Sequence, residues 1–106
     1  MDHLLSNIEP KEIAPGFRAR FVHSEFMTTS FVEVDKGAKL ALHSHMNEQI
    51  SIVTEGKFEM TIDGKTKIYE PGMVIEIPAN IEHEGKALTP CKITDIFYPV
   101  REDFKW

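Results

Sequence analysis

The chain has 106 residues, enough for one domain but too few for two. Its 12 basic and 17 acidic side chains give a formal net charge of −5, which argues against nucleic-acid and anionic-membrane partners, because both bind basic surfaces. A hydrophobic content of 42% fits a globular fold, and the single cysteine excludes an internal disulfide.

The N-terminal segment, residues 1–14, shows no clear periodicity, and a loop, a short helix and an edge strand all remain open for it. Its first residues lack the basic start and the long apolar stretch of a signal peptide. No apolar run approaches the roughly 20 residues of a membrane-spanning helix. We therefore expect a cytoplasmic protein with no membrane partner.

Glycines and prolines then cut the chain into short pieces in which apolar and polar residues alternate, as they do in half-buried strands. The alternation is clearest in the runs 17–21, 58–62 and 73–77. Between two such runs, Asp63-Gly64 suits the left-handed positions of a type I′ turn and predicts a hairpin. About eight strands predict an all-β fold, an antiparallel barrel or sandwich. Because such strands often pair across subunits, we expect a homodimer.

Histidines form the main chemical signal. His43 and His45 lie two residues apart, so in a strand both imidazoles point to the same side. Two imidazoles on one side, followed by acid and amide groups, are typical of metal ligands. His83 joins them only if the fold brings it close. His3 and His23 have no such partners in the sequence, and we expect them to be ordinary surface or core residues.

Residues 91–98 predict the last strand. Its odd positions include Ile93, Asp95 and Phe97, and if they face inward Asp95 is a carboxylate among apolar neighbours. Burial would raise the pKa of Asp95 and a nearby cation would lower it. The even positions are about as apolar as the odd ones, so a solvent-exposed Asp95 remains an equal alternative.

These residues and spacings resemble the motifs of the cupin family. The first cupin motif is matched by Gly37, His43-Ser44-His45, Gln49 and Gly56. The second is matched by Gly72, Pro78-Ala79-Asn80 and His83. The resemblance implies a small antiparallel β-barrel of the jelly-roll type, a double-stranded β-helix, covering about residues 16–100 of a single domain 1–106. The metal ligands that it implies are His43, His45, Gln49 and His83.

Two departures from the cupin motifs affect the expected site. Gln49 stands where many cupins carry Glu, which leaves three imidazoles and one amide as a neutral ligand set. A single divalent ion held by neutral ligands keeps its full charge and attracts carboxylate-bearing molecules. Zinc, nickel, manganese and iron all remain open for this set. Asn80 replaces a motif glycine, a mild change because Asn tolerates positive φ.

The C-terminal run Asp95-Ile96-Phe97-Tyr98-Pro99-Val100-Arg101-Glu102-Asp103-Phe104 resembles one cupin group, the pectin-degradation-type cupins that linearise unsaturated monouronates. In that group, the positions matching Asp95, Phe97 and Arg101 line the substrate pocket. The resemblance implies a small carboxylated sugar as substrate, a proton shuttle at Asp95, a carboxylate clamp at Arg101 and ring packing on Phe97. From the residues alone, a surface salt bridge to Glu102 or Asp103 is favoured for Arg101.

Three alternatives to this uronate-converting enzyme remain. A metal-dependent cupin oxygenase or oxidase would consume oxygen. A non-catalytic, metal-dependent sugar-acid binding module would bind without turnover. A metal-free structural barrel would tolerate replacement of His43 or His83.

Overall fold

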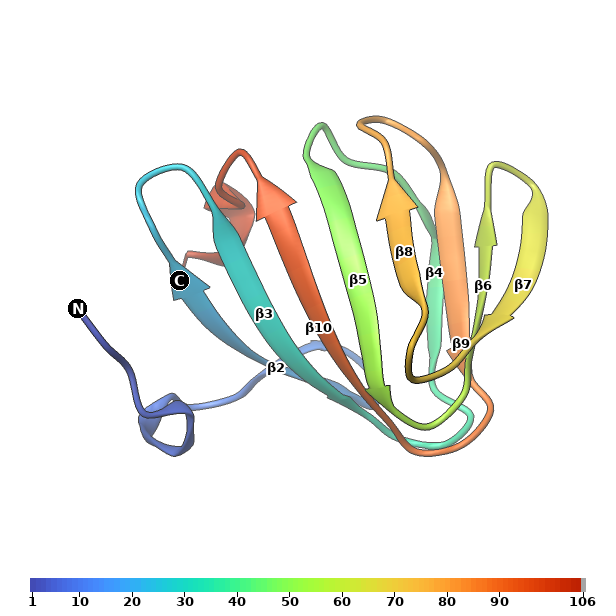
Figure 1. Cartoon of the computed structure of the whole chain (residues 1–106), viewed down its shortest axis with the longest axis horizontal. Helices are drawn as coiled ribbons and strands as arrows, with labels where there is room; N and C mark the ends of the chain where they lie inside the picture. The colour runs from blue at the N-terminus through green and yellow to red at the C-terminus, as the bar shows by residue number, and fades with distance from the viewer. Residues whose placement is uncertain (106) are drawn as a thin grey trace.

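Ten strands build two antiparallel sheets in the computed structural model, which describes residues 1–105 (Figure 1). The larger sheet contains, in spatial order, β1 (Lys11–Ala14), β2 (Phe17–His23), β3 (Thr28–Val34), β10 (Cys91–Tyr98), β5 (Glu48–Glu55) and β8 (Val74–Ile77). The smaller sheet contains β4 (Lys39–His43), β9 (His83–Ala87), β6 (Phe58–Ile62) and β7 (Lys65–Tyr69).

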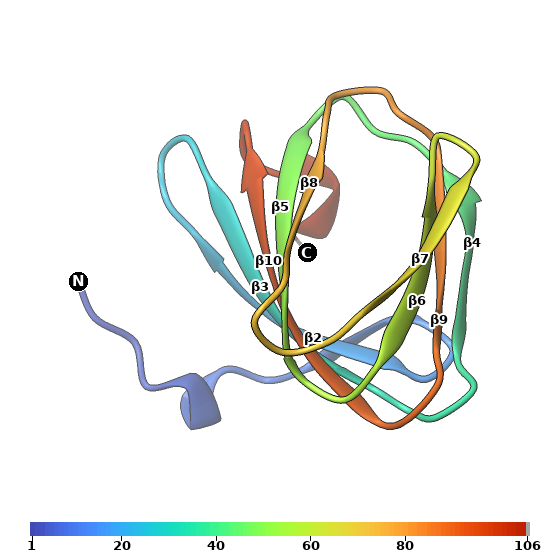
Figure 2. The same cartoon turned by 45° about the vertical axis from the view of Figure 1, so that its right-hand side comes forward.

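The two sheets lie face to face as a flattened barrel. In Figure 2 they converge at the bottom of the view and separate toward the top. The core between them is apolar and includes Phe17, Val53, Phe58 and Ile77. Two 3-10 turns, η1 (Leu5–Asn7) and η2 (Glu102–Phe104), are the helical elements of residues 1–105, and neither has the length or apolar character to span a membrane.

Alternation in the sequence accounts for the strands that it predicts. Residues 58–62 form β6 and residues 91–98 form β10, each with alternate side chains buried. At the predicted hairpin, Asp63 and Gly64 have φ of 50° and 77°, the left-handed pair that a type I′ turn requires. Asn80, with φ of 65°, also adopts the left-handed conformation expected at the motif glycine.

The structure has ten strands where the alternation predicts about eight. β1 shows no clear alternation, since its burial reads intermediate, exposed, intermediate, intermediate. β7, the second strand of the predicted hairpin, is almost entirely exposed. Among the three possibilities left open for residues 1–14, the structure combines a short 3-10 turn with an edge strand. Pairing with neighbouring strands stabilises these segments, and the local sequence pattern does not report such pairing.

The register of strand pairing arranges the inward-facing side chains of the larger sheet in rows that cross β3, β10 and β5. Val32 and Val53 pair with Ile93 in an apolar row near the convergent end. One step along, Ser30 and Ser51 flank Asp95 in a polar row. The next row places Thr28 and Gln49 beside Phe97. The interior therefore changes from apolar to polar toward the end at which the histidines lie.

Candidate metal centre

Three histidines from two strands and one loop meet inside the barrel. His43 ends β4 and is paired across the sheet with His83, the first residue of β9, while His45 follows β4 by two residues. One ring nitrogen from each lies within 4.8 Å of the others, and the ring centroids are 4.1 to 5.8 Å apart. The structure thus brings His83 to the pair that the sequence places together, in a group that is placed to bind a metal ion.

The backbone fixes which nitrogen of each ring is available. Nδ1 of His43, His45 and His83 lies 2.7, 2.9 and 2.9 Å from the carbonyl oxygens of Ala41, Asn47 and Ile81. A carbonyl oxygen only accepts, so each Nδ1 carries the proton and donates. Each Nε2 then keeps its lone pair, as in metal sites where a second hydrogen bond orients the ligand.

Burial favours the neutral form of two of these imidazoles, His45 and His83. Burial, with smaller effects from neighbouring positive groups, lowers the pKa of His83 to about 4. Burial also lowers the pKa of His45, and the Arg101 guanidinium adds to the effect. Neutral rings at neutral pH are the form that binds a divalent ion without first losing a proton.

Gln49 completes the group through its amide oxygen. Its Nε2 donates to Ser51 Oγ at 2.8 Å and to Asp95 Oδ1 at 3.2 Å, which orients the amide and turns Oε1 toward His45 Nε2 at 3.0 Å. Because His45 donates from Nδ1 and is neutral, both facing atoms are acceptors and repel each other. A cation shared by the two lone pairs would remove this repulsion. The donor set of three imidazoles and one amide oxygen therefore fits a divalent ion.

The structure places Asp95 on the inward face of β10. Its carboxylate accepts hydrogen bonds from Ser51 at 2.5 Å and from Ser30 at 3.3 Å, in addition to the Gln49 amide. Desolvation raises the pKa of Asp95, while these hydrogen bonds and the charge of Arg101 oppose the rise. An interior carboxylate with a raised pKa is a stronger proton acceptor than an ordinary one, which suits a group that takes and returns a proton.

Arg101 forms a salt bridge and also lines the cavity, the two roles considered for it from the sequence. Its Nε and Nη2 donate to Asp103 at 3.0 and 2.8 Å, which is the predicted salt bridge. The residue is nevertheless only 9% exposed and lines the cavity, because its guanidinium lies against both the Phe97 and Phe104 rings, 4.7 and 4.0 Å from their centroids. Asp103 occupies one edge of the guanidinium and leaves the Nη1–Nη2 edge for another carboxylate.

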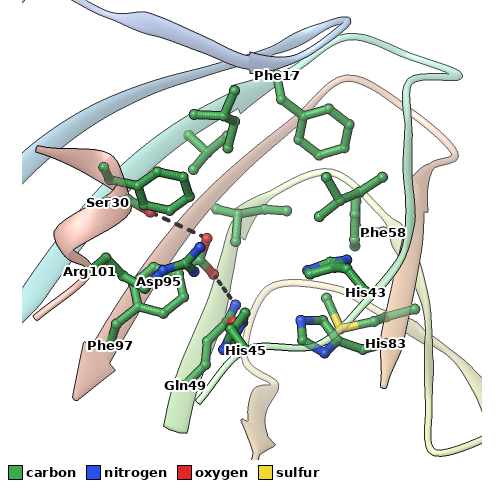
Figure 3. A pocket seen from close by; sticks show the side chains of 16 residues that line it. Phe17, Ser30, His43, His45, Gln49, Phe58, His83, Asp95, Phe97 and Arg101 are labelled. Atoms are coloured by element: carbon green, nitrogen blue, oxygen red, sulfur yellow. Dashed lines mark hydrogen bonds between the residues drawn. The ribbon is translucent and has the colours of Figure 1, made fainter. Parts of the chain in front are cut away.

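These groups line one cavity of about 150 Å³. In Figure 3 the imidazoles lie on one side, Asp95, Phe97 and Arg101 on the other, and Gln49 near His45. The apolar residues that line the cavity are Ile13, Phe17, Val32, Leu40, Phe58, Met60 and Ile93. The cavity thus has both a polar part, where Asp95 and Arg101 lie opposite the imidazoles, and an apolar lining.

All seven predicted site residues line this cavity. Sequence reasoning missed Ser30, Ser51 and Phe104 as members of the site. Ser51 follows Gln49 by two residues on a regular strand, so the period of two could have placed it on the same face. Ser30 and Phe104 reach Asp95 and Arg101 only through long-range pairing and the C-terminal turn.

The comparison with known families settles the fold family. The Cupin_2 model, described as a cupin domain, matches residues 30–97, which include every histidine of the group. The chain belongs to the Cupin_2 family. The all-β cupin fold expected from the two motifs is confirmed.

Solved cupin structures match this cupin over nearly its full length. KdgF from Halomonas sp. superposes with a TM-score of 0.90 at 26% identity, covering 97% of this chain and 96% of that one. An RmlC-like cupin from Shewanella frigidimarina gives a TM-score of 0.91 at 28% identity, covering 96% and 93%.

A curated relative gives a partial match. H2HPP isomerase from Bacillus subtilis is 28% identical over 64 residues, which is 59% of this cupin and 27% of the isomerase. This cupin thus spans about a quarter of the length of that relative. The similarity therefore concerns one cupin unit and not the whole isomerase.

Proposed function

We propose that this cupin is a metal-dependent enzyme that converts 4,5-unsaturated monouronates from pectin or alginate breakdown to their linear keto form. The observation that carries the proposal is one cavity in which an inward-facing carboxylate and a buried guanidinium lie opposite three histidines. The match to KdgF over almost the whole chain supports it. So does the C-terminal motif, which resembles that of cupins acting on these sugars.

The substrate suits the cavity in charge and in shape. An unsaturated monouronate has one carboxylate on a flat, partly unsaturated ring. The free edge of Arg101 binds the carboxylate, and Phe97, which is 4% exposed, packs against the ring and excludes water. A neutral metal-ligand set does not repel an anion, whereas a Glu at position 49 would.

His43, His45, Gln49 and His83 would hold one divalent ion, for which zinc, nickel, manganese and iron are the candidates. When bound, the ion would polarise a substrate oxygen and stabilise negative charge that develops on it. The protein contributes the orientation of the four ligands through the backbone carbonyls and through Ser51.

Asp95 moves the proton. It takes the proton of the anomeric hydroxyl, and the electron pair left on that oxygen forms a carbonyl at the anomeric carbon. The ring C–O bond at that carbon breaks, and its electron pair remains on the ring oxygen as an enolate. A proton returned to the adjacent vinyl carbon gives the keto acid, so no atom is gained or lost. Ser30 and Ser51 hold the carboxylate in place for both transfers. The reaction is therefore an isomerisation, and similarity to a protein named an isomerase supports it.

The test is a turnover assay with freshly generated 4,5-unsaturated galacturonate, following loss of the conjugated ultraviolet absorbance. Metal-loaded protein should exceed the protein-free rate, and chelation should abolish the excess. A rate equal to the control, with metal verified, would refute the assignment. Metal-dependent oxygen uptake would then favour the oxygenase alternative, and tight binding without turnover would favour the binding module.

We also propose a homodimer of single-domain chains, residues 1–106, that acts in the cytoplasm without a nucleic-acid or membrane partner. Apolar side chains exposed on the outer face of the larger sheet support self-association, notably Ile50, Val74 and Tyr98, which are 41%, 65% and 53% exposed. Light scattering on the purified protein tests this oligomeric state.

A further inference from the structure

Arg101 lies outside the sheets, and this affects how it is positioned. It follows the end of β10 at Tyr98 and precedes η2, so no ladder of strand hydrogen bonds fixes its place. Its position relative to the histidines therefore depends on contacts of the intervening backbone, residues 99–101, together with the contacts of its side chain with Phe97, Asp103 and Phe104. The following argument rests on the proposed role of Arg101 as the carboxylate clamp.

Asn47 contacts that backbone with its side chain. The amide Nδ2 donates to the carbonyl oxygen of Pro99 at 2.6 Å and to that of Val100 at 3.4 Å. Asn47 is only 5% exposed. Two carbonyl oxygens converging on a buried point need a donor there, and the Asn47 amide supplies it.

The same residue holds a metal-ligand candidate with its backbone. The carbonyl oxygen of Asn47 accepts from His45 Nδ1 at 2.9 Å and so directs His45 Nε2 into the cavity. One buried residue therefore contacts the histidine loop through its main chain and the Arg101 segment through its side chain. A second anchor, the Arg101 N–H donating to Thr28 Oγ1 at 2.9 Å, ties the segment to β3 but not to the histidines.

We propose that Asn47 is a positioning residue that holds the Arg101 guanidinium in register with the histidine group. A substrate must then present a carboxylate to Arg101 and an oxygen to the metal centre at one fixed separation. Asn47 acts through Arg101 and does not touch the substrate.

The experiment observes the Nε–H signal of the Arg101 side chain by NMR. The chain has three arginines, and the Nε–H of Arg101 is bonded to Asp103 while that of Arg20 is bonded to the Ile8 carbonyl. In ¹H–¹⁵N spectra both signals should be resolved and slow to exchange, and Arg101→Lys assigns the first. The variants are Asn47→Ala and the isosteric Asn47→Asp. The exposed neighbour Met46→Ala is the matched control.

We expect both Asn47 variants to shift or broaden the Arg101 signal and to leave the Arg20 signal unchanged. Metal affinity should stay within about twofold, because His45 bonds to a main-chain carbonyl that both variants retain. Turnover of the unsaturated uronate should fall about tenfold or more in kcat/KM, as misplacement of a substrate-binding group predicts. Met46→Ala should match the wild type in all three measurements.

An unchanged Arg101 signal in both Asn47 variants would overturn the inference, whatever happens to turnover. If the wild type shows no turnover, the proposed function fails, while the Arg101 signal still decides whether Asn47 positions it. If Asn47→Ala does not fold, the isosteric Asn47→Asp variant tests the inference instead. An unchanged Arg20 signal then shows that the sheet of that variant is intact.

Discussion

Gln49 illustrates how a single side chain joins two parts of the site. Its amide nitrogen donates to Ser51 and Asp95, and its amide oxygen faces His45. A carboxylate at this position would have no N–H to donate and would add a second negative charge beside Asp95. The neutral ligand and the inward-facing Asp95 therefore depend on each other.

Gln49→Glu should accordingly destabilise the metal-free protein, by about 1–3 kcal/mol, because it breaks two hydrogen bonds and places like charges together. A divalent ion should recover part of the loss, since the new carboxylate can bind it. Thermal unfolding with and without a chelator checks both effects, and Glu48→Gln, at the exposed neighbour, is the control. Equal stability of the metal-free Gln49→Glu and wild-type proteins would contradict this account of the network.

Asp103 predicts a pH dependence. Its hydrogen bonds with Arg101 hold the pKa of the Asp103 carboxyl below its usual range. A lowered carboxyl pKa contributes stability above the unfolded value of about 4, and the contribution is lost as pH falls through the folded value. The Asp103 side chain is 63% exposed, so solvent screening limits this contribution to at most about 1 kcal/mol.

Urea unfolding of wild type and Asp103→Asn at several pH values measures this contribution. The two proteins should differ near pH 6, and the difference should shrink as pH falls below about 4 and through the lowered pKa of Asp103. A difference that persists unchanged at low pH would mean that the stabilising effect is not electrostatic.

The sequence predicts individual site residues unequally. The period of two places His43 and His45 on one side of a strand, whereas Gln49 and His83 join them only through the resemblance to the cupin motifs. The direction of Asp95 is not predictable in this way, since both faces of its strand are similarly apolar. Burial of Arg101 depends on Phe104 and on distant partners such as Thr28, which local patterns do not report.

At the scale of strands, Gly85 of β9 leaves room for the Phe58 side chain of the neighbouring strand β6. A Cβ at Gly85 would lie 2.4 Å from the Phe58 ring, far inside normal contact. Phe58 is 1% exposed and lines the cavity, so its ring has little room to move. The glycine thus lets a large aromatic side chain fill the barrel between the two sheets.

Gly85→Ala should therefore destabilise the protein by about 1–3 kcal/mol through overpacking. Chemical denaturation measures the change in unfolding free energy. Gly85→Ala should cost less in a Phe58→Leu background than in the wild type, because the smaller side chain at position 58 frees space for the new methyl group. A double variant that is less stable than the sum of the two single changes would argue against a steric cause.

Strand prediction succeeds where one face is buried and the other exposed. The alternating segments β6, β8 and β10 follow this rule. Alternation of burial is absent from β1 at one sheet edge. It is also absent from β4, whose burial reads exposed, intermediate, exposed, exposed, intermediate. Such strands are stabilised by neighbours far along the chain, for example by the pairing of β4 with β9.

At the scale of the whole molecule, the two sheets are linked at the site, because the histidines come from the β4–β9 side and Gln49 from β5 in the larger sheet. A bound ion would join both sheets and stabilise the folded state by mass action. At an ion concentration 100 times the dissociation constant the gain is about 2.7 kcal/mol.

Calorimetry should show one unfolding transition that moves to higher temperature with divalent ion and returns on chelation. His83→Ala should remove the shift, whereas His3→Ala, at an exposed residue outside the cavity, should keep it. A shift that survives the loss of His83 would place the ion elsewhere.

The most direct measurement compares wild type with Asp95→Asn at equal, verified metal content, using 4,5-unsaturated galacturonate and the absorbance assay. Asn is isosteric, so the ligands should stay in place while the proton acceptor is lost. The account predicts a chelator-sensitive wild-type rate above the spontaneous one, and a variant slower by about 10²–10⁴-fold. A wild type no faster than the protein-free control, or a fully active Asp95→Asn, would contradict it.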